Sequence, residues 1–226
     1  MSCTCLITTA PRKAAYYLGD LLDELPLDSF RSVLICAEPG SHLPSTPNTN
    51  IHTILHHERQ GPWRNFLHGL QVAVTVVESD WILYLQDDVE ACRNLLPYLE
   101  QEWCPVLGER ILYLYSSEKL AKDKTEQWWD AELPRQSVGS LGMLMSREVA
   151  EKLVSNPPIH DSVHLMDVAI GKFCDENSIP LIRPTISLVG HRGFVSSIAN
   201  VRRIDEHRRE LKFTEDAFQL LSGETK

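Results

Sequence analysis

The sequence lacks the short motifs by which nucleotide-binding proteins are most often identified. It contains neither a GxGxxG dinucleotide fingerprint nor a GxxxxGKS/T P-loop. It also lacks any apolar run approaching the roughly 18 residues that a membrane-spanning helix needs. We therefore expect no membrane partner, and we expect any nucleotide site to be built in another way.

The chain contains fewer basic residues than acidic residues. The chain has 22 Lys and Arg against 31 Asp and Glu, which gives a formal net charge of −9. Nonspecific binding along nucleic acid depends on a basic surface that contacts many phosphates. The composition therefore argues against a general nucleic-acid clamp, although a local basic groove is compatible with it.

Cysteine pairs at CxxC spacing are also missing among the six cysteines. Three of the cysteines, Cys5, Cys36 and Cys174, lie beside apolar residues in segments that we expect in the core. Free, buried thiols are typical of proteins in reducing compartments. The amino terminus shows no basic segment followed by a long apolar run, so we predict a cytoplasmic protein.

What the chain does contain is an alternation of strand and helix patterns. Its 226 residues are 43% apolar and 23% charged, which suits a globular α/β domain. We expect a single domain over residues 1–200 and a C-terminal helical extension over 201–226. Strands are predicted near 3–9, 31–37, 51–55, 81–89, 110–115 and 138–145, with an edge strand near 179–188 that prolines interrupt. Helices are predicted near 14–25, 62–77, 94–102, 147–155 and 162–177.

The stretch Trp81–Val89 organises the rest of the sequence. Five apolar residues of types that favour β structure predict a strand buried on both faces. It runs into Asp87 and Asp88, two adjacent carboxylates whose burial is costly unless a positive charge lies nearby. Ligands bind at the carboxyl ends of strands in open α/β sheets, so we interpret the pair as part of a metal and nucleotide site. The alternative is that the pair caps a helix beginning near Glu90.

Two further polar segments are candidates for contact with a nucleotide. Arg64 and Asn65 fall in the first turn of the helix near residue 62, close to the same sheet edge. The loop after the first strand lies where a base or ribose commonly binds. Its candidate residues are Thr8, Thr9, Ala10 and Arg12.

Glycine and tryptophan mark two later segments. Gly139 and Gly142 interrupt a strand, which lets the backbone approach a ligand closely. Trp128 and Trp129 lie in a polar stretch, where they either stack on a sugar or base or fasten the loop to the core. We favour the second interpretation, and we interpret His56–His57 as surface residues rather than ligands.

Six segments resemble those of glycosyltransferases of the GT-A fold in their order and spacing. The resemblance covers roughly residues 4–198. The resemblance implies a Rossmann-like mixed central sheet flanked by helices. Each match is weak alone, and their common order is the stronger signal. The segments are Leu6–Arg12, Gly61–Leu70, Trp81–Val89, Gly139–Ser146, Asp167–Phe173 and Leu188–Gly193.

The resemblance implies a nucleoside-diphosphate sugar as donor and Mn²⁺ or Mg²⁺ as the metal. It implies that Asp88 binds the metal together with Asp87 and His191, and the imidazole favours Mn²⁺. Gln86 departs from the family's DxD-type motif, because an acidic residue usually stands there. Glutamine can hydrogen-bond a ribose hydroxyl but adds no charge.

The resemblance also implies roles in the transfer step. Arg192 and Arg12 are candidates to stabilise the leaving diphosphate. Asp167 is the candidate base that deprotonates the acceptor hydroxyl, with Asp161 in reserve. Asp167 alternatively stabilises the start of its own helix through the macrodipole. We favour an inverting over a retaining mechanism.

Neither the acceptor nor the chemistry is fixed by these residues. A protein, a glycan, a small metabolite or a hydroxylated nucleic-acid base is compatible with the sequence. A metal-dependent phosphoesterase or nuclease would also use Asp87, Asp88 and His191. A non-catalytic nucleotide-sugar-binding protein is the remaining alternative.

Overall fold

The computed structural model describes residues 2–11, 17–45, 49–132, 139–158, 166–192 and 213–222. In these residues, eight strands form one mixed sheet of order β3-β2-β1-β4-β8-β6-β9-β7, and two further strands form a small sheet. The large sheet comprises β1 (Cys3–Thr9), β2 (Ser32–Ala37), β3 (Ile51–Leu55), β4 (Trp81–Gln86), β6 (Ile111–Tyr113), β7 (Trp128–Asp130), β8 (Gly142–Ser146) and β9 (Leu181–Pro184). The small sheet comprises β5 (Val89–Ala91) and β10 (Val189–His191).

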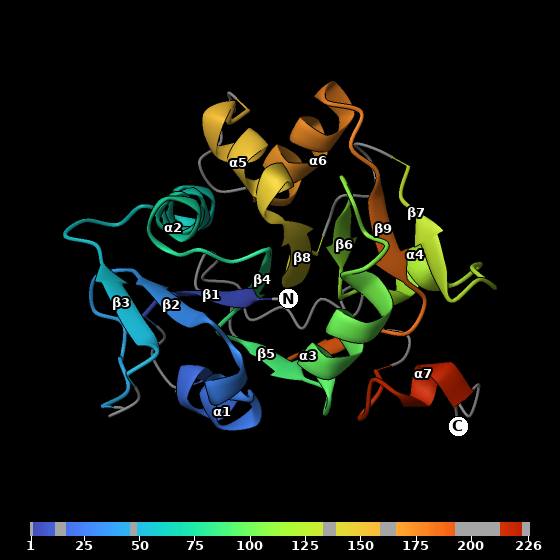
Figure 1. Cartoon of the computed structure of the whole chain (residues 1–226), viewed down its shortest axis with the longest axis horizontal. Coiled ribbons are helices and arrows are strands. Elements are labelled where there is room, and N and C mark those ends of the chain that lie inside the picture. The colour runs from blue at the N-terminus through green and yellow to red at the C-terminus, as the bar shows by residue number, and fades with distance from the viewer. Residues whose placement is uncertain are drawn as a thin grey trace.

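Helices cover both faces of the large sheet (Figure 1). α2, α5 and α6 lie on one face, and α1, α3 and the small sheet lie on the other. This arrangement confirms the predicted α/β class with a mixed central sheet flanked by helices. The helices are α1 (Tyr17–Glu24), α2 (Pro62–Val76), α3 (Leu95–Tyr98), α4 (Glu118–Ala121), α5 (Arg147–Ser155), α6 (Met166–Glu176) and α7 (Gln219–Ser222). Shorter turns are a 3₁₀ turn over Leu27–Ser29 and a π-helical turn over Leu99–Trp103.

The middle of the sheet is apolar because its strands are buried on both faces. β1 lies between β2 and β4, both parallel to it, and all seven of its residues are buried. α2 crosses this region at close range through Gly69. A Cβ atom at that position would lie 2.6 Å from Leu6 Cδ1, so a larger residue would require the Leu6 side chain to move. The six cysteines are all free and buried, as predicted.

The last strands of the sheet differ from the prediction. The prediction of an edge strand over 179–188 is wrong, because β9 lies inside the sheet between β6 and β7. Its Pro184 stands at the end of the strand, where a missing N–H is tolerated. The edge is instead β7, formed by Trp128–Asp130 in the segment expected to be a polar loop. Trp129 is 5% exposed, which supports the interpretation that this pair fastens the segment to the core.

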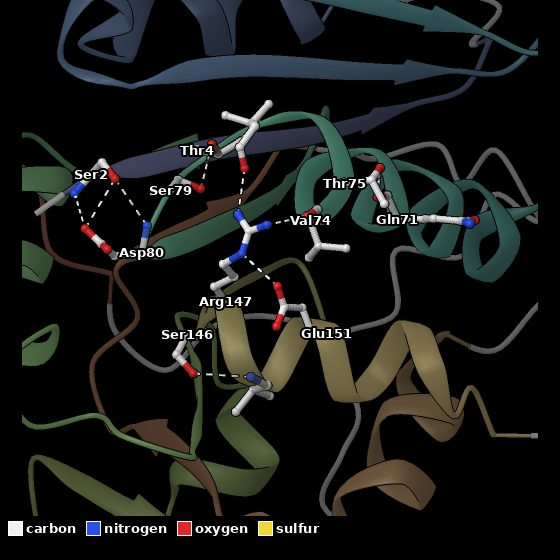
Figure 2. A network of polar contacts seen from close by, with 12 residues as sticks. Ser2, Thr4, Gln71, Val74, Thr75, Ser79, Asp80, Ser146, Arg147 and Glu151 are labelled. Carbon is white, nitrogen blue, oxygen red and sulfur yellow. Dashed lines mark hydrogen bonds and ion pairs between the residues drawn. The ribbon is translucent and has the colours of Figure 1, made fainter.

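The amino-terminal end of β4 is held by α5. Ser146 caps α5 by accepting the N–H of Val149 at 3.3 Å, as the sequence predicts. Figure 2 shows Arg147 reaching back to the end of α2, where its guanidinium donates to the carbonyls of Val77 and Val74. Its Nε lies 2.7 Å from Glu151. A cation at a helix C-terminus satisfies carbonyls that have no partner within the helix.

A second set of bonds ties the same end to the start of β1 (Figure 2). Asp80 accepts from the backbone N–H of Ser2 at 2.8 Å and from its hydroxyl at 3.2 Å. Thr4 donates to the Ser79 hydroxyl at 3.0 Å. The backbone carbonyl of Asp80 also accepts the N–H of Arg147. These bonds fix where β1, β4 and α5 begin relative to one another.

Residues 213–222 pack against the main sheet assembly. Ala217 and Leu220 are 0% and 7% exposed and belong to the core on the α1 face. Arg93 donates its backbone N–H to the Glu215 carbonyl at 2.8 Å. Most of the helical extension expected over 201–226 lies outside the described residues, so the division at residue 200 stays a prediction. In the part of the chain that is described, no helix combines the length and apolar character needed to cross a bilayer.

Candidate functional site

The carboxyl end of β4 carries two buried carboxylates. Asp87 and Asp88 are 4% and 5% exposed, and they occupy the turn between β4 and β5. Thr9 donates its hydroxyl to Asp87 Oδ2 at 2.6 Å, and the Asp87 N–H bonds to the Thr8 carbonyl at 3.1 Å. The chain continues as β5 rather than as a helix near Glu90. The capping alternative is therefore wrong.

The small sheet brings a distant histidine to this turn. β10 pairs antiparallel with β5, with His191 opposite Val89. This register places His191 Nε2 at 3.2 Å from Asp88 Oδ2, although the two residues are 103 positions apart. The Arg192 N–H donates to the Asp88 carbonyl at 2.8 Å. Backbone pairing therefore fixes the carboxylate and the imidazole side by side.

The guanidinium of Arg192 is directed toward α1. It forms an ion pair with Glu24 and lies 3.6 Å from Asp20. Its predicted contact with a diphosphate would require an exchange of these partners. The basic residue expected to help it, Arg12, lies outside the described residues, and so does Asp161.

Hydroxyl and amide groups surround the carboxylate turn on the β1 and β8 sides. Thr8 Oγ1 lies 2.8 Å from the Tyr84 hydroxyl, and burial raises the pKa of Tyr84, which keeps the phenol neutral. Ala10 follows β1 and is partly exposed. Gln86 donates its side-chain amide to the Ser140 carbonyl at 3.2 Å. The amide of Gln86 thus links the end of β4 to the turn before β8.

The predicted base, Asp167, holds the other side of that turn. It lies in the first turn of α6, and its Oδ2 accepts the Gly139 N–H at 3.0 Å. Its Oδ1 accepts the Ser140 N–H at 2.8 Å and also the Ser140 hydroxyl. A continuous set of bonds therefore runs from Asp167 through Ser140 to Gln86. Both carboxylate oxygens of Asp167 are engaged in positioning this turn.

Both predicted glycines have reasons to be glycine inside the protein. Gly139 has φ +90°, and a Cβ atom there would lie 2.8 Å from the Tyr115 ring. At Gly142, a Cβ atom would lie 3.1 Å from Leu85 Cδ2. Packing explains these positions without a ligand, and close approach to a sugar stays a prediction.

At the start of α2, Arg64 is exposed but Asn65 is 2% exposed. Asn65 lies in the first turn of α2, as expected, and its side chain is buried there. Its Nδ2 donates to the Cys36 carbonyl at 3.1 Å, with a longer contact of 3.5 Å to the Thr9 carbonyl. Asn65 is therefore a bridge between β1, β2 and α2.

Two buried charged residues of this region were missed from the sequence. Glu38 is 3% exposed and accepts the backbone N–H groups of Gln60 and Gly61, which fixes the entry to α2. Arg183 is 0% exposed and donates to the Tyr115 carbonyl at 2.9 Å. Burial lowers the pKa of Arg183 to about 10, an effect that the nearby Tyr113 and Asp167 oppose. The sequence signal that could have indicated them is a charged residue within an apolar strand, as for Arg183, or directly after one, as for Glu38.

No protein-family model matches this sequence, and no curated protein sequence matches it. Solved structures with a similar fold do exist. The crystal structure of GalNAc-T7 with UDP, GalNAc and Mn²⁺, a GT-A glycosyltransferase, matches it with a TM-score of 0.56. The two sequences are 11% identical, and the match covers 84% of this chain but 43% of that one. At this identity the likeness concerns architecture alone, and it shows that the chain has a GT-A type, Rossmann-like fold.

Proposed function

We propose that this chain is a metal-dependent glycosyltransferase that moves a sugar from a nucleoside-diphosphate donor to an acceptor hydroxyl. The observation that carries the proposal is the 3.2 Å pairing of Asp88 with His191 at the end of β4. This strand is central in a sheet of GT-A type, and ligands bind at such strand ends. GalNAc-T7, which shares the fold, was crystallised with UDP, GalNAc and Mn²⁺.

The residues at this strand end fit a divalent cation. Two neighbouring ligands of an octahedral ion at about 2.1 Å lie about 3 Å apart, which is close to the observed Asp88–His191 spacing. A carboxylate with one imidazole favours Mn²⁺ over Mg²⁺. We propose Asp88 and His191 as the residues that hold the ion, with Asp87 beside them. When bound, the cation neutralises charge that grows on the leaving diphosphate.

The neighbouring side chains position the donor. Thr9 holds the Asp87 carboxylate by a 2.6 Å hydrogen bond, which limits its rotation in the buried turn. Gln86 presents an amide at the same edge, where we propose that it contacts the ribose. We propose that Thr8, Ala10 and the exposed Arg64 complete the nucleotide contacts.

The acceptor step needs a base, for which Asp167 remains our candidate. It is bonded through Ser140 to the turn beside Gln86, so it is connected to the donor end of the sheet. Its three bonds to Gly139 and Ser140 also give it a structural role. We expect Asp167→Ala to lower thermal stability because it releases that turn. Ser140→Ala is the control, because it removes one bond to this turn and leaves the carboxylate that we propose as the base.

The acceptor class is left open in the proposal. A protein, a glycan, a metabolite or a modified nucleic-acid base supplies a suitable hydroxyl, and an inverting mechanism is part of the proposal. Six free, buried cysteines support a reducing, cytoplasmic location.

A thermal-shift screen of nucleotide-sugars with and without Mn²⁺ tests this function. We expect at least one nucleoside-diphosphate sugar to raise the melting temperature only when Mn²⁺ is present. The same donor should then be hydrolysed slowly or transferred to an added acceptor. Absence of any metal-dependent shift across the common donors would overturn the proposal.

The same samples separate the rival functions. A phosphoesterase or nuclease would hydrolyse a generic phosphodiester such as bis-p-nitrophenyl phosphate with Mn²⁺ and would show no preference among sugars. A non-catalytic binding protein would show the metal-dependent shift but neither donor hydrolysis nor transfer. Each outcome assigns the Asp88–His191 pair to a different function.

A further inference from the structure

A second group of ligand-type side chains lies apart from the Asp88–His191 pair, at the β2–β3 side of the sheet. It consists of Cys36 near the end of β2, His56 directly after β3, and His68 on α2. The sulfur and one ring nitrogen of each histidine all lie within 4.8 Å of one another. The Cys36 Sγ atom and His56 Nε2 are 3.4 Å apart. His56, which we interpret from the sequence as a surface residue, is partly buried in this group.

The fold brings these three residues together by specific contacts. β2 and β3 run parallel with Cys36 opposite Ile54, so His56 follows close to the sulfur. His68 reaches the same place because its neighbour is Gly69. A Cβ atom at Gly69 would lie 3.2 Å from the Cys36 Cβ atom, so the glycine allows α2 to approach β2 at this point.

Asn65 contacts two members of this group by hydrogen bonds and orients the His56 ring. Its Nδ2 donates to the Cys36 carbonyl at 3.1 Å, which turns its Oδ1 toward His56 Nε2 at 3.0 Å. Because Oδ1 accepts, the His56 Nε2 atom carries the proton when no metal is bound. The amide therefore holds the imidazole with Nε2 facing the sulfur.

We propose that Cys36, His56 and His68 form a zinc site, with a water molecule as the fourth ligand. Zinc prefers tetrahedral sulfur and nitrogen ligands at about 2.3 Å and 2.0–2.1 Å, which places neighbouring ligands about 3.5 Å apart. The Cys36–His56 spacing of 3.4 Å meets this requirement. His68 is exposed, so a rotation of its side chain closes the remaining distance.

Binding changes the protonation of two groups. The Cys36 thiol loses its proton to solvent and binds as a thiolate. His56 keeps one proton, which moves from Nε2 to Nδ1, so that Nε2 gives up its hydrogen bond to Asn65 Oδ1 and binds the ion. The ion then joins β2, β3 and α2. Such a link would hold β3, an edge strand whose side chains are mostly exposed, against the helix.

A cobalt titration tests the site directly, because Co²⁺ reports thiolate ligation by its spectrum. The full chain is stripped with EDTA under a phosphine reductant and titrated with Co²⁺ alone. We expect one equivalent to produce a thiolate-to-cobalt charge-transfer band and the strong d–d bands of tetrahedral Co²⁺, both removed by added Zn²⁺. Cys36→Ser should abolish the charge-transfer band.

His68→Ala provides the variant least prone to unfolding, since this side chain is exposed. We expect it to weaken Co²⁺ and Zn²⁺ binding at least about tenfold and to remove the rise in melting temperature that Zn²⁺ causes. His57→Ala is the matched control at an exposed neighbour, and Asp88→Asn is the control for the other site; neither should change the thiolate-to-cobalt charge-transfer band. A missing charge-transfer band in the wild-type chain, or a band that persists in Cys36→Ser, would overturn the proposal.

Discussion

The two ends of β4 place acidic residues in opposite environments. At the amino-terminal end, Asp80 is exposed and is satisfied by Ser2, while Arg147 and Glu151 pair nearby (Figure 2). At the carboxyl end, Asp87 and Asp88 adjoin each other and are nearly inaccessible to solvent. The first arrangement joins secondary structure elements. Buried, adjacent carboxylates oppose folding unless a proton or cation compensates them, and for this reason they are typical of functional sites.

The surroundings of a charged side chain therefore indicate its role better than its residue type does. Aspartates occur at both ends of one strand, and Asp80 and Asp87 are only seven positions apart in the sequence. Substitutions at the carboxyl end of β4 can therefore be compared with substitutions at its amino-terminal end. Functional effects are expected at the carboxyl end, and effects on stability are expected at the amino-terminal end.

The largest effect is expected for Asp88→Asn. This change keeps the size of the side chain but removes the charge that we propose for metal binding. Sugar transfer or donor hydrolysis should fall at least about 100-fold, since a bound metal contributes several kcal/mol to the transition state. Asp80→Asn is the matched control and should retain activity. Equal losses in the two variants would remove the functional distinction between the ends.

The next effect is expected for His191→Gln. Loss of the imidazole should weaken Mn²⁺ affinity by about 10- to 100-fold while the protein stays folded. Isothermal titration with Mn²⁺ in the presence of UDP measures the change. His52→Gln, on the exposed side of β3, should leave the affinity unchanged. Unaltered Mn²⁺ affinity in His191→Gln would exclude the imidazole as a ligand.

At the amino-terminal end, Arg147→Ala should reduce stability without affecting UDP binding. The guanidinium donates to the Val74 and Val77 carbonyls, and hydrogen bonds from charged groups contribute about 1.5–3 kcal/mol. Urea denaturation measures the loss. Lys152→Ala, which removes an exposed ion pair with Glu109, should change stability less. A larger loss from Lys152→Ala would contradict the role given to Arg147.

The smallest effect is expected for Ser146→Ala, which removes the cap of α5. Loss of an N-cap bond costs about 1 kcal/mol, so a modest decrease in the urea midpoint is expected. Ser146→Thr should retain most of the stability because its hydroxyl can still accept the Val149 N–H. Transfer activity should be the same in both variants, and a loss of activity in Ser146→Ala alone would show that this end also affects function.

Local sequence patterns were sufficient for much of the fold. The apolar run Trp81–Leu85, the helical periodicity of α2 and the Ser146 cap each depend on neighbours within a few residues. Such features follow from backbone geometry and burial, and the structure confirms them.

The order of the strands in the large sheet could not be predicted from local sequence patterns. β9 was expected at the edge because of its prolines, yet β7 adds to it and takes the edge position. That pairing joins segments about 50 residues apart, which no local period encodes. The burial of Asn65 and the meeting of Cys36 with His56 and His68 depend on the packing of α2 in the same way.

The candidate site was predicted in part for the same reason. The Asp87–Asp88 pair is visible because two carboxylates follow an apolar strand. The placement of His191 depends on the pairing of β10 with β5, and only the order of segments in a GT-A resemblance suggested it. The second role of Asp167, as the acceptor of bonds from Gly139 and Ser140, had no signal in the sequence.

Calorimetric titration of UDP into the wild-type chain and into Asp88→Asn, each with and without Mn²⁺, tests whether Asp88 holds a cation that binds the diphosphate. We expect Mn²⁺ to tighten UDP binding to the wild-type chain and to have no such effect on Asp88→Asn. Equal enhancement by Mn²⁺ in both proteins would exclude this role of Asp88.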